Sequence, residues 1–247
     1  NNVIRSGAGI DSITSGSGND NINGYTVDSQ AGTYSFNAYA GSKSVDAGAG
    51  DDFVFGGTGN DTILGASDDG LLDGGDGTDW LQIVAAFNDT NDAQIVNIER
   101  VTLIGAFSLN LGDQTEAFDV SGFATGAATF TGGSGNDTFS GGNGNDSVVG
   151  GAGADSLLGG TGNDTIIGAD DDALLDGGIG TLDWLLVGAN FDDASNAQIV
   201  NFVTISLSGG FSLNLGDQTE GLNVSGFATG SSTFTGGSGN DTFTGGS

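Results

Sequence analysis

A nine-residue pattern of polar and apolar positions dominates this chain of 247 residues. Residues 132–140 have the sequence Gly-Gly-Ser-Gly-Asn-Asp-Thr-Phe-Ser, and units 141–149, 150–158 and 159–167 follow without a gap. Three glycines in four positions favour a turn, and the three residues around the apolar eighth position suit a short strand. Two units then form one coil of strand, turn, strand and turn. We therefore expect an all-β fold, a parallel β-roll or β-helix solenoid with glycine-rich turns.

Further units precede and follow this run. They occupy residues 47–55, 56–64 and 74–82, and less complete ones surround Asp11, Asp20 and Asp241. Two units lack the aspartate of the sixth position, which is Gly70 in one and Ala173 in the other. The unit that begins at Gly177 has one extra residue, so its aspartate is Asp183.

A longer repeat contains these runs. Residues 107–116 recur identically at 211–220, and residues 120–126 at 224–230, an offset of 104 residues. The spacers between the runs alternate apolar and polar residues with period two, which predicts short strands that continue the solenoid as irregular β-helix coils. Residues 89–96 and 193–200 each suggest one short helical turn with an aspartate near its N-terminus.

These repeats divide the chain into seven segments. They are nonapeptide units at 1–23, an insertion at 24–46 that we interpret as a loop or hairpin, nonapeptide units at 47–82, a spacer at 83–131, nonapeptide units at 132–186, a duplicate spacer at 187–235, and the start of a further run at 236–247.

The charge of the chain limits its partners. It has 32 Asp and Glu against 3 Lys and Arg, a net charge of −29. Such a chain repels nucleic acid and anionic lipid, and no apolar run approaches the ~20 residues of a membrane span. No His or Cys is present, which excludes the usual triads and zinc sites. We expect no enzyme and no direct insertion into a membrane, but the carboxylates suit cations.

The spacing of the aspartates predicts calcium sites. One buried apolar side chain stabilises by about 1.5–3 kcal/mol, whereas ordering each backbone residue costs about 1–2 kcal/mol. One buried side chain per nine-residue unit therefore cannot stabilise the fold by itself. Calcium binds 6–8 oxygens from carboxylates and backbone carbonyls, and glycine-rich turns expose carbonyls. Several Ca²⁺ ions are therefore expected, with ligands Asp11, Asp20, Asp52, Asp61, Asp79, Asp137, Asp146, Asp155, Asp164, Asp183 and Asp241.

Each ion is expected between one unit and the second unit after it, because alternate turns stack. The predicted pairs are Asp61–Asp79, Asp137–Asp155, Asp146–Asp164 and, less regularly, Asp164–Asp183. Asp52 and Asp155 face the degenerate units. Their sites are expected to be weaker, or to be completed by Asp69 and Asp172.

The units resemble the RTX (hemolysin-type) calcium-binding nonapeptide repeats. This resemblance implies a right-handed parallel β-roll with calcium in the turns, export by type I secretion, and folding outside the cell. The spacers resemble, more loosely, the β-helical stretches between RTX runs in bacterial S-layer proteins and large adhesins. A secreted protein of the bacterial cell surface is the location that these resemblances imply.

Three functions remain at this point. The favoured one is a structural subunit of a surface lattice, sheath or filament that folds and self-associates on external calcium. The alternatives are a stalk segment of a large adhesin and the calcium-dependent secretion domain of an exported enzyme or toxin. A carbohydrate anchor stays open, because Trp80 and Trp184 at matching places could stack on sugars or pack against the spacers. The insertion holds all three Tyr, as a contact patch or a small local core.

Overall fold

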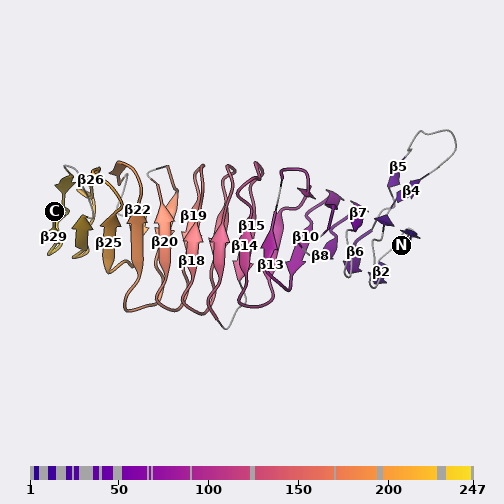
Figure 1. The fold of residues 1–247 in the computed structure, drawn as a ribbon, viewed down its shortest axis with the longest axis horizontal. Helices are drawn as coiled ribbons and strands as arrows, with labels where there is room; N and C mark the ends of the chain where they lie inside the picture. Colours follow the sequence, from indigo (N-terminus) through magenta and orange to yellow (C-terminus); the bar gives the residue numbers. More distant parts are fainter. Residues whose placement is uncertain are drawn as a thin grey trace. The chain divides into compact units, whose positions relative to one another are not determined.

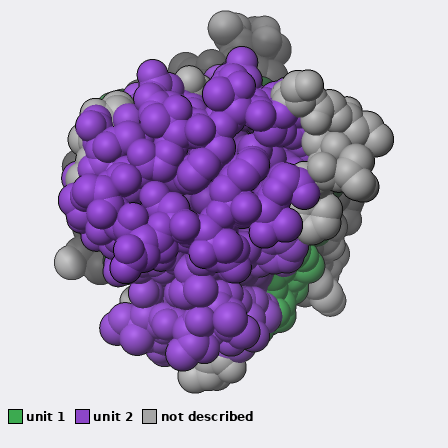
Figure 2. Space-filling model, turned by 90° about the vertical axis from the view of Figure 1, so that its left-hand side faces the viewer, with its two compact units in different colours: residues 1–108 green, residues 109–247 purple. Residues whose placement is uncertain are grey.

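A computed structural model describes most of the chain. The described residues are 3–5, 11–14, 21–23, 25–27, 36–38, 41–46, 52–65, 67, 69–89, 91–122, 126–169, 171–193, 197–226 and 232–245. Within these ranges the protein contains strands, turns and bends but no helix, which confirms the all-β prediction. The chain divides into two compact units, residues 1–108 and 109–247, which Figure 2 colours green and purple.

Most strands of the first unit run parallel and stack in two rows. One row is β1-β3-β7-β9-β12, and the other is β2-β6-β8-β10-β13. The strands of this unit are β1 (Val3–Arg5), β2 (Asp11–Thr14), β3 (Asn21–Asn23), β4 (Tyr25–Val27), β5 (Phe36–Ala38), β6 (Lys43–Asp46), β7 (Phe53–Thr58), β8 (Thr62–Gly65), β9 (Leu71–Asp76), β10 (Trp80–Ile83), β11 (Phe87–Asn88), β12 (Ile95–Val96) and β13 (Arg100–Leu103).

The second unit repeats this arrangement. One row runs β15-β17-β19-β21-β24, a second runs β16-β18-β20-β22-β25-β27-β29, and a third holds β23-β26-β28. Figure 1 shows β18, β20, β22 and β25 as successive strands of the second row. The strands are β14 (Ser108–Asn110), which begins at the last residue of the first unit, β15 (Asp119–Gly122), β16 (Thr129–Thr131), β17 (Thr138–Ser140), β18 (Ser147–Val149), β19 (Ser156–Leu158), β20 (Thr165–Gly168), β21 (Leu174–Asp176), β22 (Trp184–Val187), β23 (Phe191–Asp192), β24 (Ile199–Val200), β25 (Thr204–Leu207), β26 (Ser212–Asn214), β27 (Asn223–Gly226), β28 (Thr233–Thr235) and β29 (Thr242–Thr244).

The strand register follows the nine-residue period. Phe139 in β17 faces Leu157 in β19, and Leu157 faces Leu175 in β21, so partners lie 18 residues apart. All three side chains are fully buried. One coil therefore contains two nonapeptides, as predicted, and the apolar eighth positions form the continuous core of the solenoid.

The spacers continue the same solenoid. Leu185 of the nonapeptide strand β22 faces Ile205 in β25, and Ile205 faces Val224 in β27, all in parallel pairs with buried side chains. In the first unit, Leu81 in β10 faces Val101 in β13 in the same way. The prediction that the spacers add coils is confirmed, because their period-two strands offer the same inward row of apolar residues.

The expected helical turns are wrong. Between residues 89 and 96 the described chain makes a turn and then enters strand β12, and residues 197–200 form a turn and β24. A segment of eight residues cannot form a stable helix without tertiary support. Here the neighbouring coil supports a strand instead, because Leu72 donates its N–H to the carbonyl of Gln94.

In the insertion, β4 and β5 pair in antiparallel fashion, with Tyr25 opposite Ala38. The remaining tyrosine positions, Tyr34 and Tyr39, lie outside the described residues.

Candidate metal centre

The aspartates of the nonapeptides form two ladders of buried carboxylates. In one ladder, Oδ1 of Asp155 accepts the N–H of Asp137 at 2.8 Å. In the other, Oδ1 of Asp164 accepts the N–H of Asp146 at 2.7 Å. Each aspartate lies between a turn and the short strand that follows it. Its carboxylate therefore reaches the equivalent turn of the neighbouring coil, which lies 18 residues earlier in the sequence.

The same geometry recurs at the other predicted pairs. Asp79 accepts the N–H of Asp61 at 2.6 Å, and Asp183 accepts the N–H of Asp164 at 2.9 Å. Where a nonapeptide stacks on a spacer within the second unit, the acceptor is unchanged: Oδ1 of Asp137 binds the N–H of Phe118 at 2.9 Å, and Oδ1 of Asp146 binds that of Ala128 at 2.7 Å. The extra residue before Asp183 therefore leaves its place in the ladder intact.

The second carboxylate oxygen of these residues is buried without a hydrogen-bond donor. This holds, among the described residues, for Oδ2 of Asp79, Asp137, Asp146, Asp164 and Asp183. Buried polar atoms are almost always paired in folded proteins, and an anionic oxygen without a partner is especially unfavourable. A row of such oxygens at the same position of successive units indicates a site for a cation.

Glycine at the first position of a regular unit completes a cradle for that cation. A Cβ on Gly159 would lie 2.5 Å from Oδ2 of Asp164 and 2.7 Å from the carbonyl oxygen of Gly177. The Asp164 carboxylate and a carbonyl of the next stacked turn therefore converge on one small space that only glycine leaves open. A carboxylate and backbone carbonyls are the oxygen ligands that Ca²⁺ uses, so the residues present fit this ion.

Burial changes the protonation of these groups. Desolvation raises the pKa of Asp79, Asp137 and Asp164 to about 6, partly offset by the backbone N–H that each carboxylate accepts. Repulsion from the stacked carboxylate adds to the rise, from Asp155 in the case of Asp137. The pKa of Asp146 is also raised by desolvation. A bound cation would have the opposite effect and hold these groups as carboxylates.

The degenerate units replace the missing aspartate with the residue before it. Asp172, at the fifth position of its unit, is buried, and its Oδ2 accepts the N–H of Ala169 at 2.7 Å. Burial raises the pKa of Asp172 to about 7. Asp69 has the same position in the first unit and is also buried. Both residues therefore lie at the degenerate turns, and that they complete calcium sites there, in place of weaker sites, stays a prediction.

Sequence reasoning missed two residue types at the coil edges. At the end of one run, a glutamate takes the place of the stacked aspartate: Oε2 of Glu99 accepts the N–H of Asp79 at 2.7 Å. Buried Gln94 and Gln198 donate to the carbonyls of Asp69 and Asp172, both at 2.7 Å. The signal for Glu99 was its spacing of 20 residues from Asp79, close to one coil.

The structure places the remaining predicted ligands in different surroundings. Asp52 and Asp61 are buried at their turns, and Oδ1 of the half-buried Asp241 accepts the N–H of Leu222 at 3.1 Å. Asp11 lies in β2, and nothing is described of its side chain, whereas Asp20 lies outside the described residues. No group of three or more Asp or Glu side chains converges in the described ranges, so each site would depend on stacked carboxylates together with carbonyls.

Comparison with protein families identifies the repeat. The family model of the RTX calcium-binding nonapeptide repeat matches residues 1–26, 46–81, 124–157, 149–181 and 228–247, more than half of the chain. The chain belongs to the RTX family. It is a calcium-binding repeat protein of the RTX type, a type that is generally secreted. A search of curated proteins finds no match to this RTX chain. In the part of the chain that the structure describes, no helix is long and apolar enough to cross a membrane.

Proposed function

We propose that this RTX chain is a calcium-dependent structural segment of a bacterial cell-surface protein, and that it is not an enzyme. The observation that carries the proposal is the ladder of buried aspartates whose Oδ2 atoms lack donors, as in Asp146 and Asp164. Without a cation, these carboxylates oppose folding, and the net charge of −29 adds self-repulsion. With calcium, the same groups link stacked turns.

Two stacked units would hold each ion. For the pair Asp146 and Asp164, the ligands would be the carboxylates and the glycine carbonyls of the turns at Gly159 and Gly177. Calcium supplies the positive charge there. The chain itself supplies the position, because parallel register keeps successive turns in line at intervals of 18 residues.

Calcium would also determine where the chain folds. Binding free energy at sites that exist only in the folded state is folding free energy. A low calcium concentration inside the cell would leave the chain unfolded for export, and a higher concentration outside would fold it. This behaviour suits a secreted protein of the cell surface.

The duplicated module supports a role in a surface lattice, sheath or filament. Residues 107–116 and 211–220 are identical, so the same spacer surface recurs along the chain. Repeated surfaces on a solenoid favour regular self-association. The lack of His and Cys agrees with a structural role.

Circular dichroism and electron microscopy of the whole chain test the proposal. We expect strand signal and ordered assemblies in calcium, and loss of both in EGTA, with recovery when calcium but not magnesium is added back. Retention of full strand signal in excess EGTA would refute the calcium-dependent fold. A calcium-folded chain that never assembles would refute the lattice role and leave the fold unaffected.

A further inference from the structure

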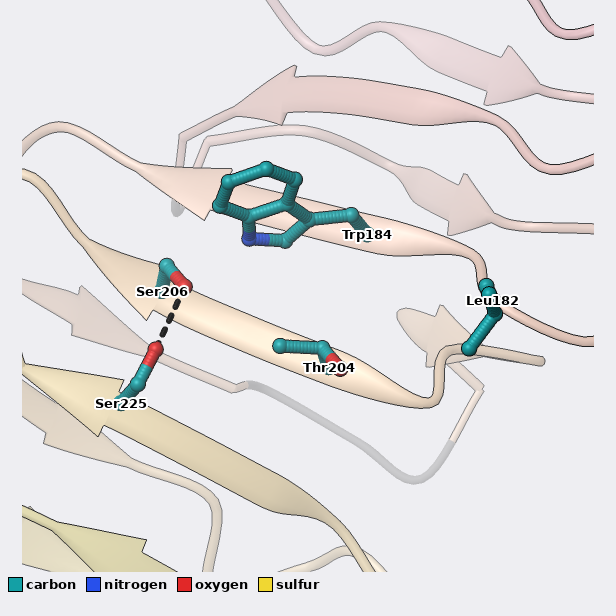
Figure 3. Close-up of a pocket in the computed structure, with 5 residues that line it drawn as sticks. All are labelled: Leu182, Trp184, Thr204, Ser206 and Ser225. Carbon is teal, nitrogen blue, oxygen red and sulfur yellow. Dashed lines mark hydrogen bonds between the residues drawn. The ribbon is translucent and has the colours of Figure 1, made fainter.

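A groove on the outer face of the second unit is not used by the calcium ladders. It has a volume of about 330 Å³ and is lined by Leu182, Trp184, Thr204, Ser206 and Ser225. Figure 3 shows the indole of Trp184 extending from β22 alongside β25, with Leu182 at one end of the groove. The groove therefore combines an aromatic ring with hydroxyl groups of two neighbouring strands.

The duplicated module provides an internal comparison for this groove. In the first module, Nε1 of Trp80 donates to Oγ1 of Thr102 at 2.6 Å. The residue that corresponds to Thr102 in the second module is Ser206, whose Oγ instead shares a hydrogen bond of 2.7 Å with Oγ of Ser225. Nε1 of Trp184 consequently has no hydrogen-bond acceptor among the described residues. One substitution, threonine to serine, leaves an indole N–H available.

The surroundings of the two tryptophans also differ. Asp76 and Glu99 of the first module correspond to Ile179 and Val203 of the second, and Leu182 is the residue inserted in the second module. Ile179 is 77% exposed and Leu182 66%. Exposed apolar side chains, two of them in place of charged residues, are typical of a binding surface.

We propose that the Trp184 groove binds a neutral saccharide. A pyranose ring presents a face of C–H groups, which would stack on the indole, and hydroxyls at its rim. The indole N–H and the hydroxyls of Thr204 and Ser225 can meet those hydroxyls, since Thr204 Oγ1 has no partner among the described residues. Ser206 is buried and would not touch the sugar. Its role is to bond with Ser225 and so leave the indole N–H free.

The chemistry of the groove selects against charged ligands. Among the described residues, no carboxylate and no basic side chain lines the groove, so this lining offers nothing to a cationic or an anionic group. The net charge of −29 also repels anionic polymers. The volume lies at the lower end of small-molecule sites, and the groove is open to the surface. It therefore suits one sugar unit within a longer neutral glycan.

Binding of soluble saccharides to the calcium-loaded chain tests this assignment. The probes are short oligomers of glucose, galactose, mannose and N-acetylglucosamine, and their binding is measured by saturation-transfer NMR. We expect Trp184→Ala to weaken binding about tenfold or more, as for an aromatic residue at the centre of a contact. Ser206→Thr should weaken it too, because the hydroxyl would engage the indole as Thr102 engages Trp80.

The matched control is Trp80→Ala, which removes the same side chain from the first module and should leave the affinity unchanged. Circular dichroism and calcium stoichiometry of each variant check that it folds. In a Trp80→Phe protein, Trp184 is the single tryptophan, and its fluorescence should change saturably with saccharide.

Three results would overturn the proposal. The first is that no probe binds at about 10 mM, beyond the millimolar affinity of a weak site. The second is equal loss of binding in Trp80→Ala and Trp184→Ala. The third combines two observations: the parent chain binds no saccharide, and its calcium-dependent self-association, measured by sedimentation, is abolished by Trp184→Ala. In that case the groove is a contact between copies of the chain.

Discussion

Replacing Asp146 by asparagine separates a role in calcium binding from a role in hydrogen bonding. Oδ1 of Asp146 accepts the N–H of Ala128 at 2.7 Å, and Oδ2 is buried without a donor. Asparagine keeps the shape and the first oxygen, and exchanges the second for an amide. The variant therefore retains the coil contact and loses the negative charge that a cation needs.

The size of the effect follows from mass action. A site that exists only in the folded state contributes RT ln(1 + [Ca²⁺]/Kd), which is about 2.7 kcal/mol at 100 times Kd. For a chain of this size, that loss lowers Tm by roughly 5–10 °C. Without calcium the sign changes: desolvation raises the pKa of Asp146, so removing its charge should leave the fold as stable as the parent or more stable.

The assay is a set of thermal melts followed by circular dichroism, in saturating calcium and in calcium-free buffer. Equilibrium dialysis counts the bound ions, and one fewer is expected in Asp146→Asn. Asp217→Asn, which makes the same charge change at an exposed residue, is the matched control and should lose none. An Asp146→Asn protein that loses the same stability with and without calcium would refute the reasoning.

A double-mutant cycle tests which carboxylates share an ion. Asp164 stacks on Asp146, whereas Asp155 belongs to the other ladder. Asp146→Asn and Asp164→Asn should therefore be non-additive in calcium, by about 0.5–3 kcal/mol. Asp146→Asn and Asp155→Asn should add. Equal coupling in both pairs would contradict sharing between alternate turns.

Three further results are expected. Gly159→Ala should abolish one calcium site and lower Tm, because its Cβ would enter the cradle. The control is Gly188→Ala, whose Cβ would make only an ordinary contact of 3.8 Å with Oγ of Ser208, and an equal effect of both variants would contradict the cradle. Asp172→Ala should weaken one calcium site without abolishing the others in dialysis, and an unchanged calcium count and affinity would remove Asp172 from the ligands. In calcium-free buffer, stability should fall as pH rises from about 4 to about 6–7 and then level off, since the pKa values of Asp137 and Asp172 are raised from 3.8 to about 6 and about 7, so that the folded state favours their protonated forms over this range. Melts from pH 4 to 8 check this, and calcium should reverse the trend.

The sequence by itself determined the coil. The period of nine, the apolar eighth position and the glycine turns all act within one unit, and together they predict the 18-residue register seen between Phe139 and Leu157. They also predict which aspartates stack, because Asp146 and Asp164 occupy the same position in alternate units. These features are local, and their repetition makes the long-range pairing follow.

Only the tertiary structure decided what happens where the repeat is interrupted. Asp172 is buried one position before the missing aspartate of its unit, where its carboxylate lies close enough to Asp155 for their repulsion to raise its pKa. Glu99 ends a ladder from within a spacer. In both cases the partner lies about one coil away in sequence, so the pattern of a single unit offered Asp172 only as one alternative and gave Glu99 no role.

The two tryptophans illustrate the same limit. Trp80 and Trp184 are equivalent in sequence, and either packing or exposure was consistent with their positions. Their environments diverge because the partner on the next strand is Thr102 in one module, whereas Ser206 turns to Ser225 in the other. Contacts across the sheet depend on which hydroxyl finds which neighbour, and that choice is made only when the coils stack.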